Sequence, residues 1–344
     1  LMPGLTAVGG PNRGGRRGEV TVETLERRAR LKDQLGRYER MLEIRMVEER
    51  IQGLYNDGYV RGSTHLSIGQ EAVSVGVAAA ILPTDTVTCT YRGHATALAM
   101  GVTPEQVLGE ICGRQSGCAG GVGGSMHLSE REVGLLPTFA IVGAGLPVAA
   151  GAALTAQTRG TRDIAVAFTG DGSSNIGAFH ETMNLASIWR LPMIFVIENN
   201  LYGEYTRINY TTPIADLADR AAAYGMPSEI VDGQDAEAVL AVAARAAERA
   251  RSGAGPTLLE MKTYRFSGHS RSDPATYRPA EELEAWRRRD PLPLAKEALL
   301  TSVSESDLDA LADRMAEEVE TAVKAVLASP APELSAMLTH VSAD

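Results

Sequence analysis

Hydrophobic positions in the middle of the chain switch between two patterns. Residues 164–169 and 193–197 form nearly continuous apolar runs, which are typical of parallel strands buried on both faces. Between them, apolar residues recur every three or four positions from 176 to 186, which predicts a helix with one buried face. A strand, a helix and a second strand in this order form a right-handed crossover, so we expect a parallel sheet.

The same alternation extends to both sides of this unit. Thr103 and Gln106 form a predicted capping box, with Pro104 at the first helical position. We therefore expect an α/β fold with a doubly wound, mostly parallel sheet and helices on both faces. Residues 264–279 show no periodicity and predict a long loop. Further strands are expected at 86–90, 229–231 and 257–263, and helices at 22–56, 69–82, 103–113, 146–157 and 235–251, with two more helices at the end of the chain.

The length of 344 residues alone would suggest roughly two domains. The motifs described below instead favour one large domain at 21–300, preceded by a disordered arm at 1–20 and followed by a helical extension at 301–344. The arm is rich in Gly and Arg and lacks the apolar core of a signal peptide. One apolar stripe of six side chains in the extension predicts packing against the body or against another subunit.

Charge and cysteine content narrow the class of protein. The net charge of −10 gives no electrostatic footprint for nucleic acid or for an anionic membrane. Residues 133–158 carry no charge, but their prolines and glycines favour a buried helix over a membrane span. Cys89, Cys112 and Cys118 form no CxxC pair, which argues against a disulfide framework or a zinc site and indicates a cytoplasmic protein.

Two polar motifs follow the two central strands. Gly170, Asp171 and Gly172 end the first strand, and Asn199 and Asn200 end the second. Ligands of open α/β sheets bind at this edge. A carboxylate from Asp171 and an amide carbonyl from Asn200 are hard oxygen donors suited to Mg²⁺, and the glycines let the backbone approach a phosphate. An isolated GDG would more often be a tight turn, but its spacing from Asn-Asn favours a diphosphate and metal site.

This constellation resembles the thiamin-diphosphate motif. Five further segments narrow the resemblance: YRGH at 91–94, GGSMH at 123–127, IVGA at 141–144, NLYG at 200–203 and YRFSGHS at 264–270. Together they are similar to the α subunit of the thiamin-dependent first component of 2-oxo acid dehydrogenase complexes, over about residues 40–293. The pyruvate and acetoin branches resemble the chain more than the branched-chain branch does.

The resemblance implies roles for individual residues. Asp171 and Asn200 would bind Mg²⁺ through their side chains, and Tyr202 through its backbone carbonyl. His65 and His269 match the two active-site histidines and would stabilise developing charge or relay protons. The cofactor would be held by Tyr91, Arg92, Ala140, Val142, Asp171, Gly172, Ser173, Asn200, Tyr202 and His269. Ala140 and Ser173 stand where relatives often have Gly and Ala.

The resemblance also implies the activity and the partners. The chain would decarboxylate a 2-oxo acid or cleave acetoin with thiamin diphosphate, and pass the acyl group to a lipoyl carrier on an acyltransferase core. Such enzymes need a carboxylate against the aminopyrimidine ring, and no second α/β repeat in this chain supplies one. A β subunit would supply it at the interface of an α2β2 heterotetramer.

Other functions fit the residues less well. No complete G-x-G-x-x-G, P-loop or G-x-S-x-G motif occurs. A degenerate, non-catalytic subunit and a biosynthetic carboligase without a lipoyl partner both stay open, as do pyruvate, acetoin and larger 2-oxo acids as substrates. The role of the loop from Gly268 to Arg278 is open as well. His94, His127 and His180 are expected to be structural.

Overall fold

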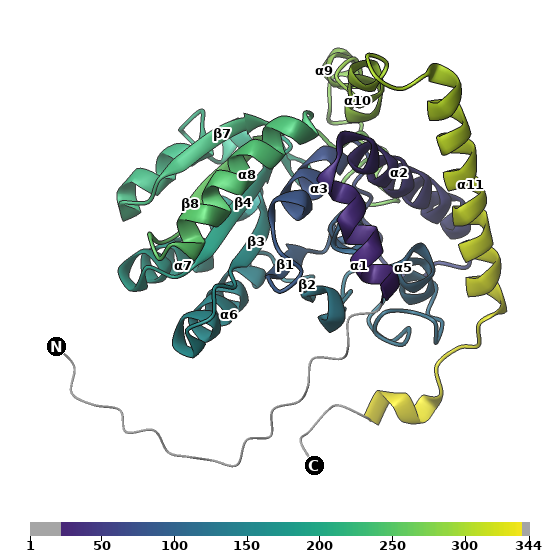
Figure 1. Ribbon diagram of the computed structural model, residues 1–344, viewed down its shortest axis with the longest axis horizontal. Coiled ribbons are helices and arrows are strands. Elements are labelled where there is room, and N and C mark those ends of the chain that lie inside the picture. Colours follow the sequence, from purple (N-terminus) through teal and green to yellow (C-terminus); the bar gives the residue numbers. More distant parts are fainter. Residues whose placement is uncertain (1–21, 339–344) are drawn as a thin grey trace.

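The central sheet contains six parallel strands in the order β2-β1-β3-β4-β8-β7 (Figure 1). The structure is a computed structural model that describes residues 22–338. A second sheet pairs two short antiparallel strands, β5 (Tyr202–Gly203) and β6 (Thr206–Arg207). The strands of the main sheet are β1 (Thr86–Thr90), β2 (Leu135–Phe139), β3 (Ala165–Gly170), β4 (Met193–Asn199), β7 (Ser228–Asp232) and β8 (Thr257–Lys262).

Helices cover both faces of this sheet, which confirms the doubly wound α/β prediction (Figure 1). The described part of the chain also contains six short 3₁₀ helices: η1 (Arg30–Lys32), η2 (Arg131–Val133), η3 (Gly172–Asn175), η4 (Ile208–Tyr210), η5 (Leu217–Tyr224) and η6 (Leu334–Leu338). The α-helices are α1 (Val22–Ala29), α2 (Gln34–Asn56), α3 (Glu71–Ala80), α4 (His94–Met100), α5 (Pro104–Ile111), α6 (Gly145–Arg159), α7 (Gly177–Trp189), α8 (Ala236–Arg251), α9 (Ala280–Arg287), α10 (Pro291–Leu299) and α11 (Glu305–Ala328).

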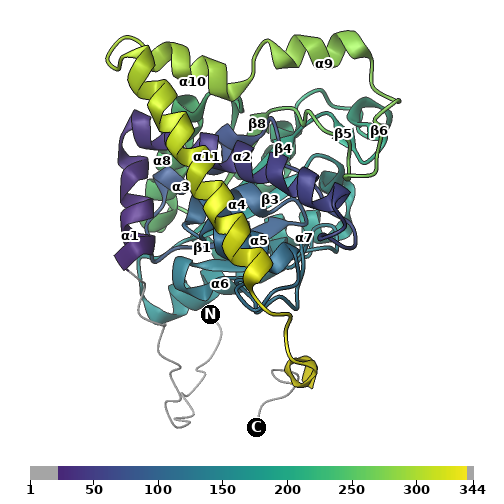
Figure 2. The ribbon, with the colours of Figure 1, turned by 90° about the vertical axis from the view of Figure 1, so that its right-hand side faces the viewer.

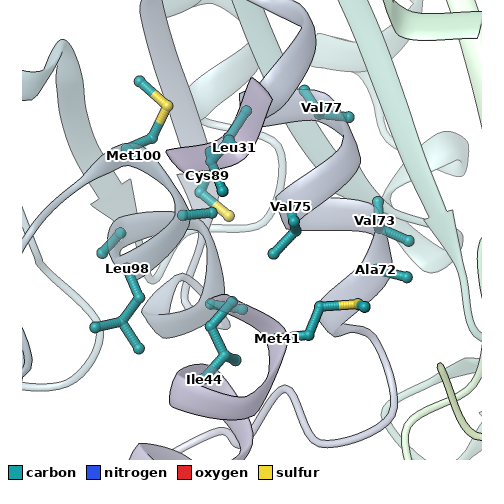
Figure 3. Packing of buried hydrophobic residues seen from close by; sticks show 14 of the residues in the cluster. Leu31, Met41, Ile44, Ala72, Val73, Val75, Val77, Cys89, Leu98 and Met100 are labelled. Carbon is teal, nitrogen blue, oxygen red and sulfur yellow. The ribbon is translucent and has the colours of Figure 1, made fainter. Parts of the chain in front are cut away.

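Each central strand contributes alternate side chains to two separate cores. Val166 and Phe168 of β3 enter the larger core, whereas Ala165 and Ala167 enter the smaller one beneath α6 and α7. In the larger core, side chains of α2, α3, α4 and β1 meet (Figure 3). Burial on both faces explains why these strands are continuously apolar in the sequence.

Three predicted elements differ from the structure. The first expected helix is interrupted at Asp33, whose carboxylate caps α2 by accepting a hydrogen bond from Gly36 N at 2.8 Å. Strand β2 was not expected within the uncharged stretch at 133–158; it contains Pro137 and is an edge strand, where proline is tolerated. Helix α6 is also not a buried helix, because Val148 and Leu154 on its outer face are exposed.

The C-terminal part contains three helices after the long loop, not two. Helix α11 runs along α2 and α5 (Figure 2), so its apolar stripe packs against the body of this chain. No helix within residues 22–338 is both long and apolar enough to cross a membrane. The arm at 1–20 and the last residues of the extension, 339–344, lie outside the described residues. The stripe consists of Leu308, Leu311, Met315, Val319, Val323 and Val326.

Candidate active site

Every candidate residue from the sequence lines one cavity of about 950 Å³. Because the strands are parallel, the loops after β1, β2, β3, β4 and β8 all emerge at the same edge of the sheet. His65 joins them from the loop between α2 and α3. The five loops carry, in that order, Tyr91 and Arg92; Ala140 and Val142; Asp171, Gly172 and Ser173; Asn200 and Tyr202; and His269.

Asp171 has the features of a buried anion that lacks a cation. Its side chain is 2% exposed, and Oδ1 accepts a hydrogen bond from Gly172 N at 2.8 Å. Oδ2 is buried and has no hydrogen-bond partner. Burial raises the pKa of this carboxyl to about 6. A divalent cation at Oδ2 would satisfy this oxygen, so the residues present fit a metal ion.

Asn200 and Tyr202 continue this oxygen-rich edge across β4. Asn200 is 7% exposed, and its Oδ1 accepts a hydrogen bond from Tyr202 N at 3.3 Å, which leaves a further lone pair on the amide oxygen. The described residues hold no group of three or more His, Cys, Asp or Glu side chains arranged for a metal. One carboxylate with neutral oxygens suits Mg²⁺, which keeps positions for phosphate oxygens and water.

The backbone beside Asp171 is shaped for close approach. A Cβ atom on Gly172 would lie 3.0 Å from the Cα of Gly203, so the loops after β3 and β4 touch where only hydrogen atoms fit. The N–H group of Gly172 already donates to Asp171. The 3₁₀ helix η3 follows directly, and α7 begins only at Gly177, so the helix N-terminus expected next to Asp171 is displaced by one turn.

Arg92 joins the two segments that carry the histidines. Its guanidinium is 7% exposed and donates to the carbonyl of Leu66 at 2.5 Å and to the carbonyl of His269 at 2.8 Å. Two guanidinium nitrogens of Arg92 therefore donate to backbone carbonyls, one from the residue after His65 and one from His269 itself. Arg92 lines the cavity, but it also positions the histidines, a role that the sequence did not indicate.

The two histidines and Tyr91 form one aromatic cluster. The ring centroid of His65 lies 4.5 Å from that of Tyr91 and 5.0 Å from that of His269. Burial, and then the charge of Arg92, lowers the pKa of His65 to about 3 and that of His269 to about 4. Both rings are therefore neutral near pH 7 in this structure. A neutral ring can accept a proton at one nitrogen and donate at the other.

Three further histidines lie outside the cavity lining, as expected for structural residues. His94 is fully buried, with Nδ1 3.1 Å from Glu48 and Nε2 2.9 Å from Ser125 Oγ. His127 contacts the carbonyl of Gly123. His180 contacts the hydroxyl of Tyr224 at 2.5 Å.

The glycine-rich loop at 117–124 has a different role from a phosphate cradle. The fully buried carboxylate of Glu110 on α5 accepts four hydrogen bonds from its backbone. The loop therefore encloses an anion that belongs to the chain itself. These N–H groups are therefore occupied by an acceptor within the chain, although Met126 just beyond them lines the cavity. The donors are the N–H groups of Ala119, Gly121, Gly123 and Gly124, at 2.6–3.1 Å.

Glu198 is a cavity residue that the sequence reasoning did not select. It is 6% exposed at the end of β4, and burial raises its pKa to about 7. Its position directly before Asn199 and Asn200 can be read from the sequence. A carboxylate at the end of an otherwise apolar strand indicates a functional residue.

Comparisons with known proteins agree with this geometry. The family model described as "Dehydrogenase E1 component" matches residues 39–335. The α subunit of acetoin:2,6-dichlorophenolindophenol oxidoreductase from Bacillus subtilis is 43% identical over 305 residues, covering 88% of this chain and 92% of the relative. The α subunit of the pyruvate dehydrogenase E1 component from Zymomonas mobilis is 41% identical over 307 residues, covering 88% and 87%.

The likeness extends to plants. The chloroplastic α-3 subunit of the pyruvate dehydrogenase E1 component from Arabidopsis thaliana is 41% identical over 315 residues, covering 89% of this chain and 74% of the relative. The family model covers the five loops and the His65 segment that line the cavity. The chain therefore belongs to the family of the dehydrogenase E1 component.

Proposed function

We propose that this chain is the α subunit of a thiamin-diphosphate-dependent dehydrogenase that acts on a 2-oxo acid such as pyruvate, or on acetoin. The observation that carries the proposal is the gathering of all eleven candidate residues around one cavity. Membership of the E1 family and the α-subunit names of its relatives support the same conclusion. The α/β domain that we propose at 21–300 includes all of these residues, and the helical extension is proposed at 301–344.

The site suits a magnesium-bound diphosphate. Asp171 Oδ2 and the Asn200 amide oxygen would bind Mg²⁺, with the carbonyl of Tyr202 beside them. Gly172 and Ser173 would approach the diphosphate closely, while Tyr91, Arg92, Ala140 and Val142 line the rest of the cofactor. When bound, thiamin diphosphate supplies the carbon nucleophile and the electron sink for cleavage of the bond next to the ketone.

The chain contributes orientation and proton handling to this reaction. His65 and His269 lie with their rings 5.0 Å apart in the cavity and are the proposed catalytic residues. Neutral rings can hydrogen-bond a developing alkoxide or move a proton without adding a fixed charge. The acyl group would then pass to a lipoyl carrier of an acyltransferase core.

A β subunit is the proposed partner in an α2β2 heterotetramer. Ile141 and Val142 line the cavity yet are 74% and 47% exposed, which leaves an apolar rim beside the site. Apolar side chains at the mouth of a cavity support coverage by another subunit. The free cysteines Cys89, Cys112 and Cys118 support the proposed cytoplasmic location.

Calorimetric titration of the assembled α and β subunits with Mg²⁺ and thiamin diphosphate tests the cofactor site. Asp171→Ala should abolish Mg²⁺-dependent binding, because it removes the only carboxylate among the proposed ligands. Asp313→Ala, at an exposed position of α11, is the matched control and should bind as the wild type does. Binding by Asp171→Ala at wild-type affinity would contradict the proposal.

Two activity measurements test the need for the β subunit and the role of His269. The chain without its β subunit should not decarboxylate pyruvate, so robust turnover by the chain alone would refute the need for the partner. His269→Ala should keep cofactor binding but lose acyl transfer to lipoamide. Unchanged lipoamide reduction by this variant would remove His269 from the mechanism.

A further inference from the structure

The loop that carries the proposed metal ligand Tyr202 has an unusual backbone. Leu201 has φ 73° and Glu204 has φ 54°, both in the left-handed region that side chains other than glycine rarely adopt. These two residues flank the short strand β5, which begins at Tyr202. Such conformations persist only where surrounding contacts hold them, and they concentrate at functional sites.

Glu282 on α9 holds this loop from outside the cavity. Its Oε1 accepts hydrogen bonds from the Tyr202 hydroxyl at 2.8 Å and from the Tyr264 hydroxyl at 2.9 Å. Its Oε2 accepts from Arg207 at the end of β6. The carboxylate therefore binds both strands of the small sheet, and Tyr264 joins them to the segment that leads to His269.

The contacts around Glu282 reinforce one another. Arg207 Nη1 also contacts the Tyr202 hydroxyl at 3.0 Å, and its guanidinium lies 5.5 Å from the centroid of the Tyr202 ring. The Glu282 side chain is 15% exposed, so these interactions are weakly screened. The ring of Tyr264 stacks on that of Trp286, which lies on α9 like Glu282, with centroids 5.5 Å apart. This contact fixes α9 against the segment that leads to His269.

The second strained residue is held from the same side. The fully buried Arg265 donates to the carbonyl of Glu204 at 2.6 Å and to the hydroxyl of Tyr277 at 3.0 Å. Glu204 is therefore fixed from outside its own loop, whereas the backbone of Leu201 bonds within the loop, to Asn199 Oδ1 and to Ile208 N.

We propose that Glu282 is a positioning residue for the cation and diphosphate site, because it holds the Tyr202 carbonyl and the turn at Leu201 in the geometry that binding needs. The inference rests on the proposed function. Glu282 does not line the cavity, and it contacts the hydroxyl of Tyr202 rather than the carbonyl oxygen that would bind the metal. It therefore acts through Tyr202. Loss of the carboxylate should loosen the ligand loop without changing the groups that react.

Calorimetry on the assembled α and β subunits tests this role, with MgCl₂ titrated in the presence of thiamin diphosphate. Glu282→Gln should raise the apparent Kd for Mg²⁺ by about tenfold or more, the usual effect of losing a partner that orients a metal ligand. Activity at saturating Mg²⁺ and cofactor should recover to within about twofold of the wild type by the same reasoning. A role in the overall fold alone would instead lower the melting temperature without cofactor and leave the apparent Kd unchanged.

Two further variants complete the experiment. Glu284→Gln, at an exposed position of the same helix, is the matched control and should bind Mg²⁺ as the wild type does. Tyr202→Phe keeps the backbone carbonyl but removes one donor to Glu282, so the apparent Kd should rise in the same direction by a smaller factor. This variant decides the matter if Glu282→Gln does not fold.

The outcomes separate the two proposals. If the wild-type assembly binds neither Mg²⁺ nor thiamin diphosphate, the proposed function fails. If the wild type binds while Glu282→Gln and Tyr202→Phe bind equally well, only the role of Glu282 is overturned.

Discussion

Arg92→Lys separates two roles that one guanidinium combines in this structure. The substitution keeps a positive charge beside the proposed diphosphate but replaces a planar fork with a single ammonium group. The fork donates to the carbonyl of Leu66, next to His65, and to the carbonyl of His269, and both histidines are proposed to be catalytic. Lysine at this position can reach one carbonyl at a time, so one of the two hydrogen bonds is lost.

The expected size of the effect follows from that lost bond. A hydrogen bond from a charged donor contributes about 1.5–3 kcal/mol. At 1.36 kcal/mol per factor of ten, the loss corresponds to about a 10- to 150-fold decrease in rate if it is expressed fully in the transition state. Because the charge is retained, the Kd for thiamin diphosphate should change by less than about threefold.

The assay is steady-state turnover of the assembled enzyme, combined with calorimetric binding of the cofactor. Arg249→Lys is the matched control, because Arg249 also donates to a backbone carbonyl, that of Ala254, but does so at an exposed position. The control should keep wild-type kcat and Kd. A value of kcat for Arg92→Lys within twofold of the wild type, or a loss confined to cofactor binding, would refute the positioning role of Arg92.

Three other predictions follow from contacts described by the structure. Gly76→Ala should destabilise the fold by about 1–3 kcal/mol in urea denaturation, because the new Cβ would lie 2.6 Å from the side chain of buried Val239. Gly53→Ala is the control, since its Cβ would meet only the flexible side chain of Arg50, and equal midpoints for the two variants would contradict the prediction. Glu110→Gln should cost at least about 2 kcal/mol of stability by leaving buried N–H groups unpaired, and hydrogen exchange at 119–124 should quicken. The pKa of His269 is about 4 in the folded chain, below the ordinary value, so its contribution to the free energy of unfolding should fall as the pH falls from 6.5 towards 4. The rate of its carbethoxylation should stay level between about pH 5.5 and 7.5, where the rate for an ordinary imidazole changes about tenfold.

The fold was predictable because the central strands are buried on both faces. Residues 164–168 and 193–197 carry apolar side chains at every position, since odd and even positions enter different cores. Strand β2 was missed because Pro137 interrupts its short apolar pattern. Proline is compatible with this strand only because it lies at the edge of the sheet, and the sequence does not state which strand is the edge.

The site was predictable to the extent that its chemistry is local. Asp171 and Asn200 stand directly after two strands, so strand assignment alone placed them together. The Glu282 contact with Tyr202 joins positions 80 residues apart and could not be inferred from spacing. Arg92 shows the same limit, because its partner His269 lies 177 residues away.

The enclosed carboxylate of Glu110 has a consequence for the loop at 117–124, which lies just before the cavity residue Met126. An anion attached to a helix cannot dissociate, so the N–H groups of this loop keep their acceptor at every concentration of cofactor. Asp171, by contrast, has a buried carboxylate oxygen without a partner, which the proposed cation would satisfy. The chain itself therefore fixes the glycine-rich loop, whereas the proposed metal site would respond to the supply of cofactor.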